Sequence, residues 1–317
     1  MPKGGGSQKP LRSITEIKHG RLRWLNVLAG DKKALLQLKR EFNFSDQDLR
    51  DTLPPLQRHK IFDRGKYIFM VLLFPFYDRK SGELRPSEVD FFIGKNFLVT
   101  VHAQELEPLT NLFKTCGIDS ASRNICLNSD PATLLYEILS RELNDASRML
   151  VHLSNDIDEI EKKIFSEFEK TTIWTLLRIK TNIVNFRRSM QSHKLIVNRL
   201  LEMVPRFFAT GKLENYSRDL VLGIQEIWDL LDNYKDTVDA LHSTNVSLID
   251  FRTNMIMKTL TIIAVITFPL TLFATLFATD LPGMPFRDLS YGFWVVVGII
   301  VAGALAMFEF FEKKKWL

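Results

Sequence analysis

Two long uncharged apolar stretches near the C-terminus constrain the fold more than any other feature of the sequence. They run from Thr259 to Ala278 and from Tyr291 to Phe308, about 18–20 residues each. At ~1.5 Å per residue, a helix of this length crosses a hydrocarbon core of ~30 Å. A pair of buried helices in a soluble protein is the alternative, but uncharged runs this long are rare there. We therefore predict two membrane-spanning helices.

The charges around the two stretches predict their orientation. Two basic residues precede the first stretch, Arg252 and Lys258, and three follow the second, Lys313, Lys314 and Lys315. The positive-inside rule then places both chain ends in the cytosol and makes residues 280–290 an extracytosolic loop. Residues 1–13 are polar, Gly-rich and basic rather than signal-like, and we expect a flexible tail there. We expect the body of the chain to stay in the cytosol, attached to the inner membrane.

Composition argues against several other classes of protein. The net charge of +5 raises nucleic-acid binding as an alternative, but no basic stripe is interleaved with stacking aromatics, so no nucleic-acid partner is expected. Cys116 and Cys126 lack a metal-binding spacing and are expected to be free thiols in a reducing compartment. The six histidines are scattered singly. With no nucleophile-plus-base spacing and no phosphate-binding Gly loop, we expect neither an enzyme nor an organic cofactor.

Residues 14–130 combine strand and helix patterns. The segments expected as strands are Leu22–Val27, Tyr67–Tyr77 and Val89–His102, because they are rich in β-branched and aromatic residues. Helices are expected around Asp31–Phe42 and Ser45–Leu53. These patterns predict a cytosolic α/β domain, so the fold class is α+β followed by helices.

The rest of the cytosolic part is expected to be helical. Residues 131–212 suggest a hairpin of two antiparallel helices, one acidic around Asp156–Glu169 and one basic around Arg178–Arg199. Solvated outer faces are the simplest interpretation of these charges, and an acidic helix tip that gathers cations is the alternative. A stalk helix is then expected over residues 213–279, continuing into the first span, with the second span at 291–311 and a basic tail at 312–317.

The stalk segment carries an apolar seam with alternating steps of four and three residues. Its members are Leu220, Ile224, Ile227, Leu231, Tyr234, Val238 and Leu241. Such a heptad seam requires partner helices, either from the same chain or from other subunits. As one helix, Leu213–Ala278 would extend roughly 100 Å at ~1.5 Å per residue. A helix this long is not stable alone in water, and Pro269 marks a candidate position for a kink.

A second stripe lies on a different face of the same predicted helix. Its members are Ser243, Ser247, Asn254, Met257, Thr261, Phe268, Thr271 and Thr275. Polar side chains on a helix in the bilayer are costly against lipid, so they are expected to face protein or water. Interhelical hydrogen bonds and a water-filled axial pore both satisfy this requirement.

The segment KTLTIIAVITFPLTLFATLF, followed by a short loop, a second span and a terminal KKKWL, resembles the CorA family of magnesium and other divalent-cation channels. The resemblance covers nearly the whole chain. It implies a homopentameric funnel in the membrane, with self as partner, Mg²⁺ or another divalent cation as the transported and regulatory ion, and five copies of the long helix lining one pore.

The resemblance also assigns expected roles to residues. The pore-lining positions would be Asn254, Met257, Leu260, Phe268, Thr271 and Asp280. Leu260 and Phe268 would form apolar constrictions that gate by dewetting. Asp78 and Asp219 would bind metal between neighbouring cytosolic domains, and Lys313, Lys314 and Lys315 would form a basic ring.

The outer end of the first span departs from the family pattern. The family carries a Gly-Met-Asn triplet after an aromatic residue, whereas this chain has Phe277, Ala278, Thr279 and Asp280. The selectivity loop would then present a ring of carboxylates, some with raised pKa values because like charges lie close together. Such a ring attracts cations but selects less by hydration geometry, so Mg²⁺, Co²⁺, Ni²⁺ and Zn²⁺ are all candidate ions.

Two hypotheses from different classes remain. One is a divalent-cation channel or transporter with an altered mouth, and the other is a non-transporting membrane scaffold or regulator that retains the fold. Ion flux in liposomes separates them.

Overall fold

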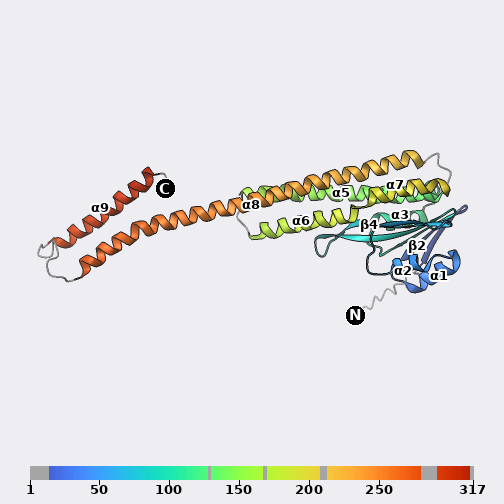
Figure 1. The fold of residues 1–317 in the computed structure, drawn as a ribbon, viewed down its shortest axis with the longest axis horizontal. Coiled ribbons are helices and arrows are strands. Elements are labelled where there is room, and N and C mark those ends of the chain that lie inside the picture. Colours follow the sequence, from blue (N-terminus) through green and yellow to red (C-terminus); the bar gives the residue numbers. More distant parts are fainter. Residues whose placement is uncertain (1–13, 128–129, 167–169, 208–212, 280–290, 315–317) are drawn as a thin grey trace, which may run out of the picture. The chain divides into compact units, whose positions relative to one another are not determined.

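The structure is a computed structural model that describes residues 14–127, 130–166, 170–207, 213–279 and 291–314. The chain divides into two units, Met1–Leu241 and His242–Leu317 (Figure 1). The strands of the first unit are β1 (Ile14–His19), β2 (Leu22–Leu28), β3 (Lys60–Asp63), β4 (Tyr67–Asp78), β5 (Glu83–Gly94) and β6 (Phe97–His102). Its helices are α1 (Lys32–Phe42), α2 (Asp46–Asp51), α3 (Glu107–Ile118), α4 (Ser120–Leu127), α5 (Pro131–Ser166), α6 (Lys170–Met190), α7 (His193–Met203) and the 3₁₀ turn η1 (Val204–Arg206). Helix α8 (Leu213–Ala278) belongs to both units, and α9 (Gly292–Lys313) to the second.

The six strands form one mixed sheet in the order β1-β2-β6-β5-β4-β3. Only the β2–β6 pair is parallel among the strand pairs of the described residues. The sequence prediction placed a strand over Val89–His102, and the structure instead has β5 and β6 joined by a tight turn. A Cβ at Gly94 would overlap the ring of Phe97, so a larger residue there would have to displace that ring.

One face of the sheet is covered by α1 and α2. Both helices begin at side-chain caps: Asp31 accepts from the backbone N–H groups of Lys33 and Ala34, and Ser45 accepts from that of Gln47. An apolar cluster fills the space between these helices and the sheet, with Leu38, Phe44, Phe69 and Phe92 among its members. Figure 1 shows α1 and α2 on the opposite side of the sheet from the longer helices.

The other face of the sheet is covered by the longer helices. Trp24 is fully buried there and donates its indole N–H to the Thr100 hydroxyl at 3.2 Å. The side-chain amides of two asparagines on α6 form hydrogen bonds with the backbone of β5. The N–H of Leu84 donates to Asn182 at 2.9 Å, and Asn185 donates to the carbonyl of Leu84 at 2.8 Å. These bonds fix α6 against the sheet.

The helical segment after residue 131 contains more helices than predicted. We expected two antiparallel helices, but the second is interrupted at Gln191 and Ser192 and continues as α7. No proline or glycine marks the interruption, which explains why the sequence pattern gave no sign of it.

The heptad seam of α8 is buried within its own chain. Six of its seven residues are buried and Tyr234 is half-buried. Polar contacts beside the seam join α8 to α6 and α7. Lys180 pairs with Asp239 at 2.7 Å, Lys194 donates to Gln225 at 2.6 Å, and Arg187 lies over the Trp228 ring. Of the two partners that the sequence left open, the seam therefore uses neighbours from the same subunit.

Candidate functional site

The C-terminal unit consists of two helices that are long and apolar enough to cross a membrane. Both contain an 18-residue window of mean hydropathy 2.2. Only 6 % of that window in α8 and none of it in α9 is buried. Helices inside a soluble core would be largely buried, so this exposure favours a lipid or multi-chain environment.

The α9 helix contacts one side of α8. At Gly303 of α9, a Cβ would lie 3.6 Å from the side chain of Leu270. In the described part of this unit, the buried large apolar side chains are Ile262 on α8 and Phe311 on α9. Ile262 and Leu270 share one side of α8, because eight residues amount to roughly 80° of net rotation. This side of α8 is therefore the one that packs on protein.

The polar stripe lies on the opposite side of α8. At 100° per residue, its members centre roughly 155° away from the midpoint between Ile262 and Leu270. The expected pore positions in the described residues are all exposed: Asn254, Met257, Leu260, Phe268 and Thr271. Phe268 is 76 % exposed. The structure thus brings these five positions onto a face that α9 leaves uncovered.

The stripe hydroxyls donate to the carbonyls of their own helix. Thr261 donates to Met257 at 2.8 Å and Thr271 donates to Thr267 at 2.8 Å. Because the hydroxyl hydrogens are used within the helix, the outward parts of these groups are oxygen lone pairs. Such a surface accepts hydrogen bonds from the water shell of a cation. The hydroxyl hydrogens of these threonines are therefore bonded without the help of a second helix.

The two ends of the membrane unit are only partly described. Thr279 ends α8, with its hydroxyl 2.5 Å from the Leu276 carbonyl, whereas Asp280 lies outside the described residues. At the other end Lys313 pairs with Glu309 at 2.8 Å and Lys314 caps α9. Lys315, the third member of the expected basic ring, also lies outside the described residues.

Asp78 is engaged within its own hairpin. At the end of β4 its carboxylate accepts from the backbone N–H of Lys80 and from the Ser81 hydroxyl, both at 3.0 Å, and pairs with Arg85 at 3.4 Å. The Lys80 hydrogen bond is the largest cause that lowers the pKa of Asp78. Asp219 is exposed on α8. Among the described residues, no group of three or more His, Cys, Asp or Glu is placed to hold a metal ion within one chain.

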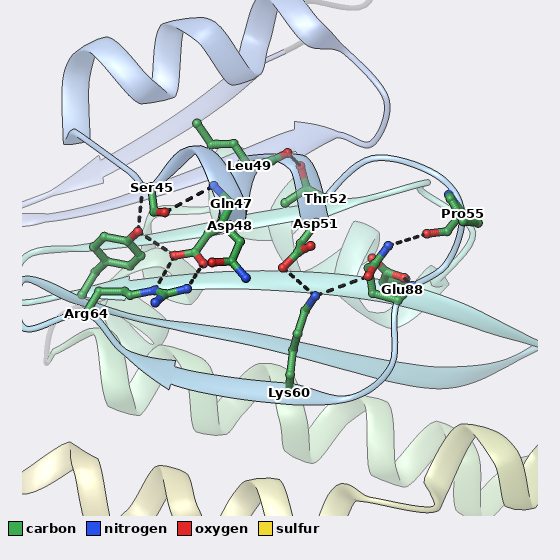
Figure 2. A network of polar contacts seen from close by, with 12 residues as sticks. Ser45, Gln47, Asp48, Leu49, Asp51, Thr52, Pro55, Lys60, Arg64 and Glu88 are labelled. Carbon is green, nitrogen blue, oxygen red and sulfur yellow. Dashed lines mark hydrogen bonds and ion pairs between the residues drawn. The ribbon is translucent and has the colours of Figure 1, made fainter.

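A buried polar network that the sequence analysis did not identify lies under α2 (Figure 2). Asp48 is fully buried and accepts from Arg64 Nε at 3.0 Å and from the Tyr67 hydroxyl at 2.7 Å. Nearby, Lys60 pairs with Asp51 at 2.7 Å. In sequence, DQDLRD is typical of an exposed helix, and only the register of β4 shows that Asp48 meets a tyrosine.

Two neighbouring carboxyls lie on β5, the buried Asp90 and the half-buried Glu88. Asp90 is 2 % exposed and one of its oxygens has no hydrogen-bond partner in the described part of the chain. Burial raises the pKa of Asp90 well above its usual value, with the neighbouring Glu88 as the next cause. Burial also raises the pKa of Glu88.

Glu142 of α5 caps the start of α3. Its carboxyl accepts from the backbone N–H of Leu109 at 2.9 Å, and burial raises its pKa to about 8. The folded protein therefore keeps this proton between the unfolded pKa near 4.5 and the folded pKa near 8, whereas the unfolded chain releases it. Stability from this group is present at low pH and is lost as pH rises through that window.

A Glu142→Gln variant tests this assignment. The amide keeps an acceptor for Leu109 and cannot ionise, so it is expected to be near neutral at pH 5 and to stabilise the protein at pH 8.5. The gain grows by up to roughly 1.4 kcal/mol per pH unit across the window. Melting temperatures of the two proteins at both pH values measure the effect. An equal shift at both pH values would contradict the raised pKa.

Comparison with known proteins identifies the family. The family model described as CorA-like Mg²⁺ transporter protein matches residues 19–314. This chain belongs to the CorA-like family. A cobalt/magnesium transport protein CorA of Thermotoga maritima is 26 % identical over 298 residues, covering 93 % of this chain and 83 % of that protein.

Solved structures show the same fold. The complete CorA magnesium transporter from Methanocaldococcus jannaschii superposes with a TM-score of 0.82 at 19 % identity, covering 96 % of this chain and 94 % of that one. The full-length CmaX protein gives 0.71 at 16 % identity, covering 93 % and 89 %. The predicted architecture of an α/β domain, a long helix and two candidate C-terminal membrane-spanning helices is confirmed as the CorA fold.

Proposed function

We propose that this CorA-like protein transports divalent cations, Mg²⁺ first among them, along a pore lined by the stripe on α8. The observation that carries the proposal is the position of this stripe on the side of α8 opposite α9. A single chain leaves Thr261, Thr271 and Thr275 exposed at membrane depth, where lipid is a poor environment for them, and leaves Asn254 exposed just before the span. Several copies arranged around one axis place the same groups against water.

We further propose that five copies assemble into a funnel in the inner membrane, with both chain ends in the cytosol. Within it, residues 14–130 form the α/β domain, 131–212 the helical hairpin and 213–279 the stalk and first span. The basic residues that flank both spans support this orientation. Five-fold assembly rests on membership of the family and on the exposed stripe.

The proposed pore-lining residues have different roles. Asn254 and Thr271 contact the hydration water of the ion, and Leu260 and Phe268 close the pore by excluding water. Asp280 supplies a carboxylate ring at the outer mouth, in place of the neutral triplet of the family. Such a ring concentrates cations and discriminates less among Mg²⁺, Co²⁺, Ni²⁺ and Zn²⁺. The positive ring proposed from Lys313, Lys314 and Lys315 lies at the cytosolic end.

Purified protein in liposomes tests the proposal directly. Liposomes loaded with a Mg²⁺-sensitive dye are expected to show influx above empty liposomes. Asp280→Ala should change the rate or the order of preference among the four ions, and Asp280→Asn separates charge from the ability to bind water. Absence of flux for all four ions would leave the non-transporting scaffold as the function of this fold.

Thermal melting with and without Mg²⁺ tests the proposed regulatory pair, Asp78 and Asp219. If Mg²⁺ binds the native assembly between neighbouring subunits, ~10 mM Mg²⁺ stabilises it by about 2.7 kcal/mol when this concentration is 100 times the Kd. We expect a rise in melting temperature that the Asp219→Asn variant loses. An unchanged Mg²⁺ response in that variant, with flux intact, would remove the pair from the mechanism.

A further inference from the structure

Two histidines far apart in the sequence lie against each other between α7 and the sheet. The ring centroids of His59 and His193 are 5.2 Å apart, and the ring of Phe74 on β4 lies 5.1 Å from that of His193. His193 is 1 % exposed and His59 is half-buried. Because His59 immediately precedes β3 and His193 is the first residue of α7, the pair forms part of the contact between this helix and the sheet.

The ring nitrogens of the pair are poorly satisfied. Among the described residues, neither nitrogen of His193 has a hydrogen-bond partner, and Nε2 of His59 has none either. The fourth nitrogen, Nδ1 of His59, accepts from the backbone N–H of Leu73 at 3.4 Å. An accepting nitrogen carries no proton, so His59 is neutral with its proton on Nε2. Protonation of Nδ1 would break the hydrogen bond to β4.

No carboxylate of the described residues acts on either ring. The backbone carbonyls of Arg188 and Met190 favour the charged forms of His59 and His193, but burial outweighs them. The charged side chains of the surrounding elements are engaged with other groups or exposed. Lys60 pairs with Asp51, Asp63 accepts from Gly65, Glu88 accepts from Gln57, Arg187 pairs with Asp232, Lys194 donates to Gln225, Asp229 accepts from Gln225, and Arg58, Arg188, Arg199, Glu202 and Glu226 are exposed.

Burial without a counter-charge keeps both rings neutral. It lowers the pKa of His193 to about 3, with the neighbouring His59 as the next cause, and it also lowers the pKa of His59. His193 lies in the first turn of α7, where the helix dipole opposes a positive charge. An imidazole in water has a pKa of about 6.5. The stability that this contact contributes is therefore present above about pH 6.5 and is lost as the pH falls below it.

We propose that His59 and His193 form an acid-sensitive latch, which holds α7 on the sheet at neutral pH and releases it at acidic pH. Helix α7 is also a partner of the long helix, because Lys194 donates to Gln225 of α8 at 2.6 Å. Release of α7 removes part of the packing of α8 and so transmits a change of pH to the helix that enters the membrane. This inference goes beyond the proposed transport function.

Hydrogen exchange of the full-length protein in lipid nanodiscs, followed by mass spectrometry at pH 7.5 and 5.5, tests the latch. After correction for the intrinsic rate of exchange, the opening constant of peptides from α7 is expected to rise at the lower pH. A histidine that is neutral only in the closed state gives a rise of about tenfold, and two give up to about a hundredfold. Peptides from α1, on the other face of the sheet, are expected to show no such rise.

Two variants separate the pH response from an ordinary loss of packing. His193→Met fills a similar volume without a titratable group, and His59→Asn keeps an acceptor for the N–H of Leu73. Each variant is expected to reduce the pH-dependent rise by up to about tenfold, whatever its effect at pH 7.5. The matched control is His152→Gln on α5, where the histidine is exposed, and it is expected to leave the rise unchanged.

Two results would overturn the latch. One is an opening constant of α7 in the unsubstituted protein that is the same at both pH values. The other is a rise in both the His193→Met and the His59→Asn protein as large as in the unsubstituted one, which would place the acid response on other groups. Ion flux is not part of this measurement, so a failure of the latch and a failure of the transport proposal are distinguishable.

Discussion

Replacing Phe268 with serine is expected to raise the basal flux of Mg²⁺ through the reconstituted protein. Phe268 projects from the stripe on α8 with 76 % of its surface exposed, so in the proposed assembly several phenyl rings face the axis. Removing an apolar constriction lowers the barrier for a hydrated ion, because water can then occupy the narrow part of the pore. Each ~1.4 kcal/mol of lost barrier accelerates flux about tenfold.

The matched control for this change is Phe273→Ser. Phe273 is also exposed, at 49 %, but it lies on the side of α8 nearer to Leu270 and α9. The Phe273→Ser variant is expected to leave basal Mg²⁺ flux unchanged. If both variants leak equally, the serine acts by loosening the membrane helices, and Phe268 is not a gate. If neither leaks, the constriction lies elsewhere.

Replacing Arg64 with methionine is expected to cause the largest loss of stability among the single changes considered. Asp48 is fully buried, and Arg64 binds it through Nε at 3.0 Å and through a second guanidinium nitrogen (Figure 2). Without the arginine, Tyr67 is the one side chain among the described residues that still donates to this buried carboxylate. Breaking a buried pair in this way costs about 3–5 kcal/mol. A fall in melting temperature of roughly 10 °C or more is expected for a unit of this size.

The same substitution at an exposed pair provides the control. Arg148 pairs with Asp145 at 2.8 Å on α5, with its own side chain 72 % exposed. Arg148→Met is expected to cost less than about 1 kcal/mol, because exposed pairs contribute little. The double variant Asp48→Leu with Arg64→Met is expected to recover part of the lost stability, since no charge is then left buried. Equal melting temperatures for the two single variants would contradict this account.

The features predicted well from sequence are those that depend on long, periodic segments. The two apolar stretches and the seam from Leu220 to Leu241 each repeat a simple pattern over many residues. Hydropathy and helical geometry alone therefore locate the spans and the long helix, and the family resemblance adds the order of the parts. The proposed pore positions come from the family resemblance and stay predictions.

The features that were missed depend on contacts between distant parts of the chain. Strand β3 is only four residues long and carries two charges, so no pattern marks it. The carboxyls of Asp48, Asp90 and Glu142 are indistinguishable in sequence from surface acids. Their burial follows from the pairing of strands and from helix packing. The seam on α8 predicted that a partner exists, and only the structure shows that the partners are α6 and α7 of the same chain.

The hydroxyl groups of the stripe have a consequence for proton conduction. A chain of hydroxyls relays protons only when each hydroxyl can donate to the next group along the path. Thr261 and Thr271 instead donate to carbonyls of their own helix, so their hydrogens are held away from the axis. We expect these side chains to support the passage of hydrated ions without forming a proton wire of their own.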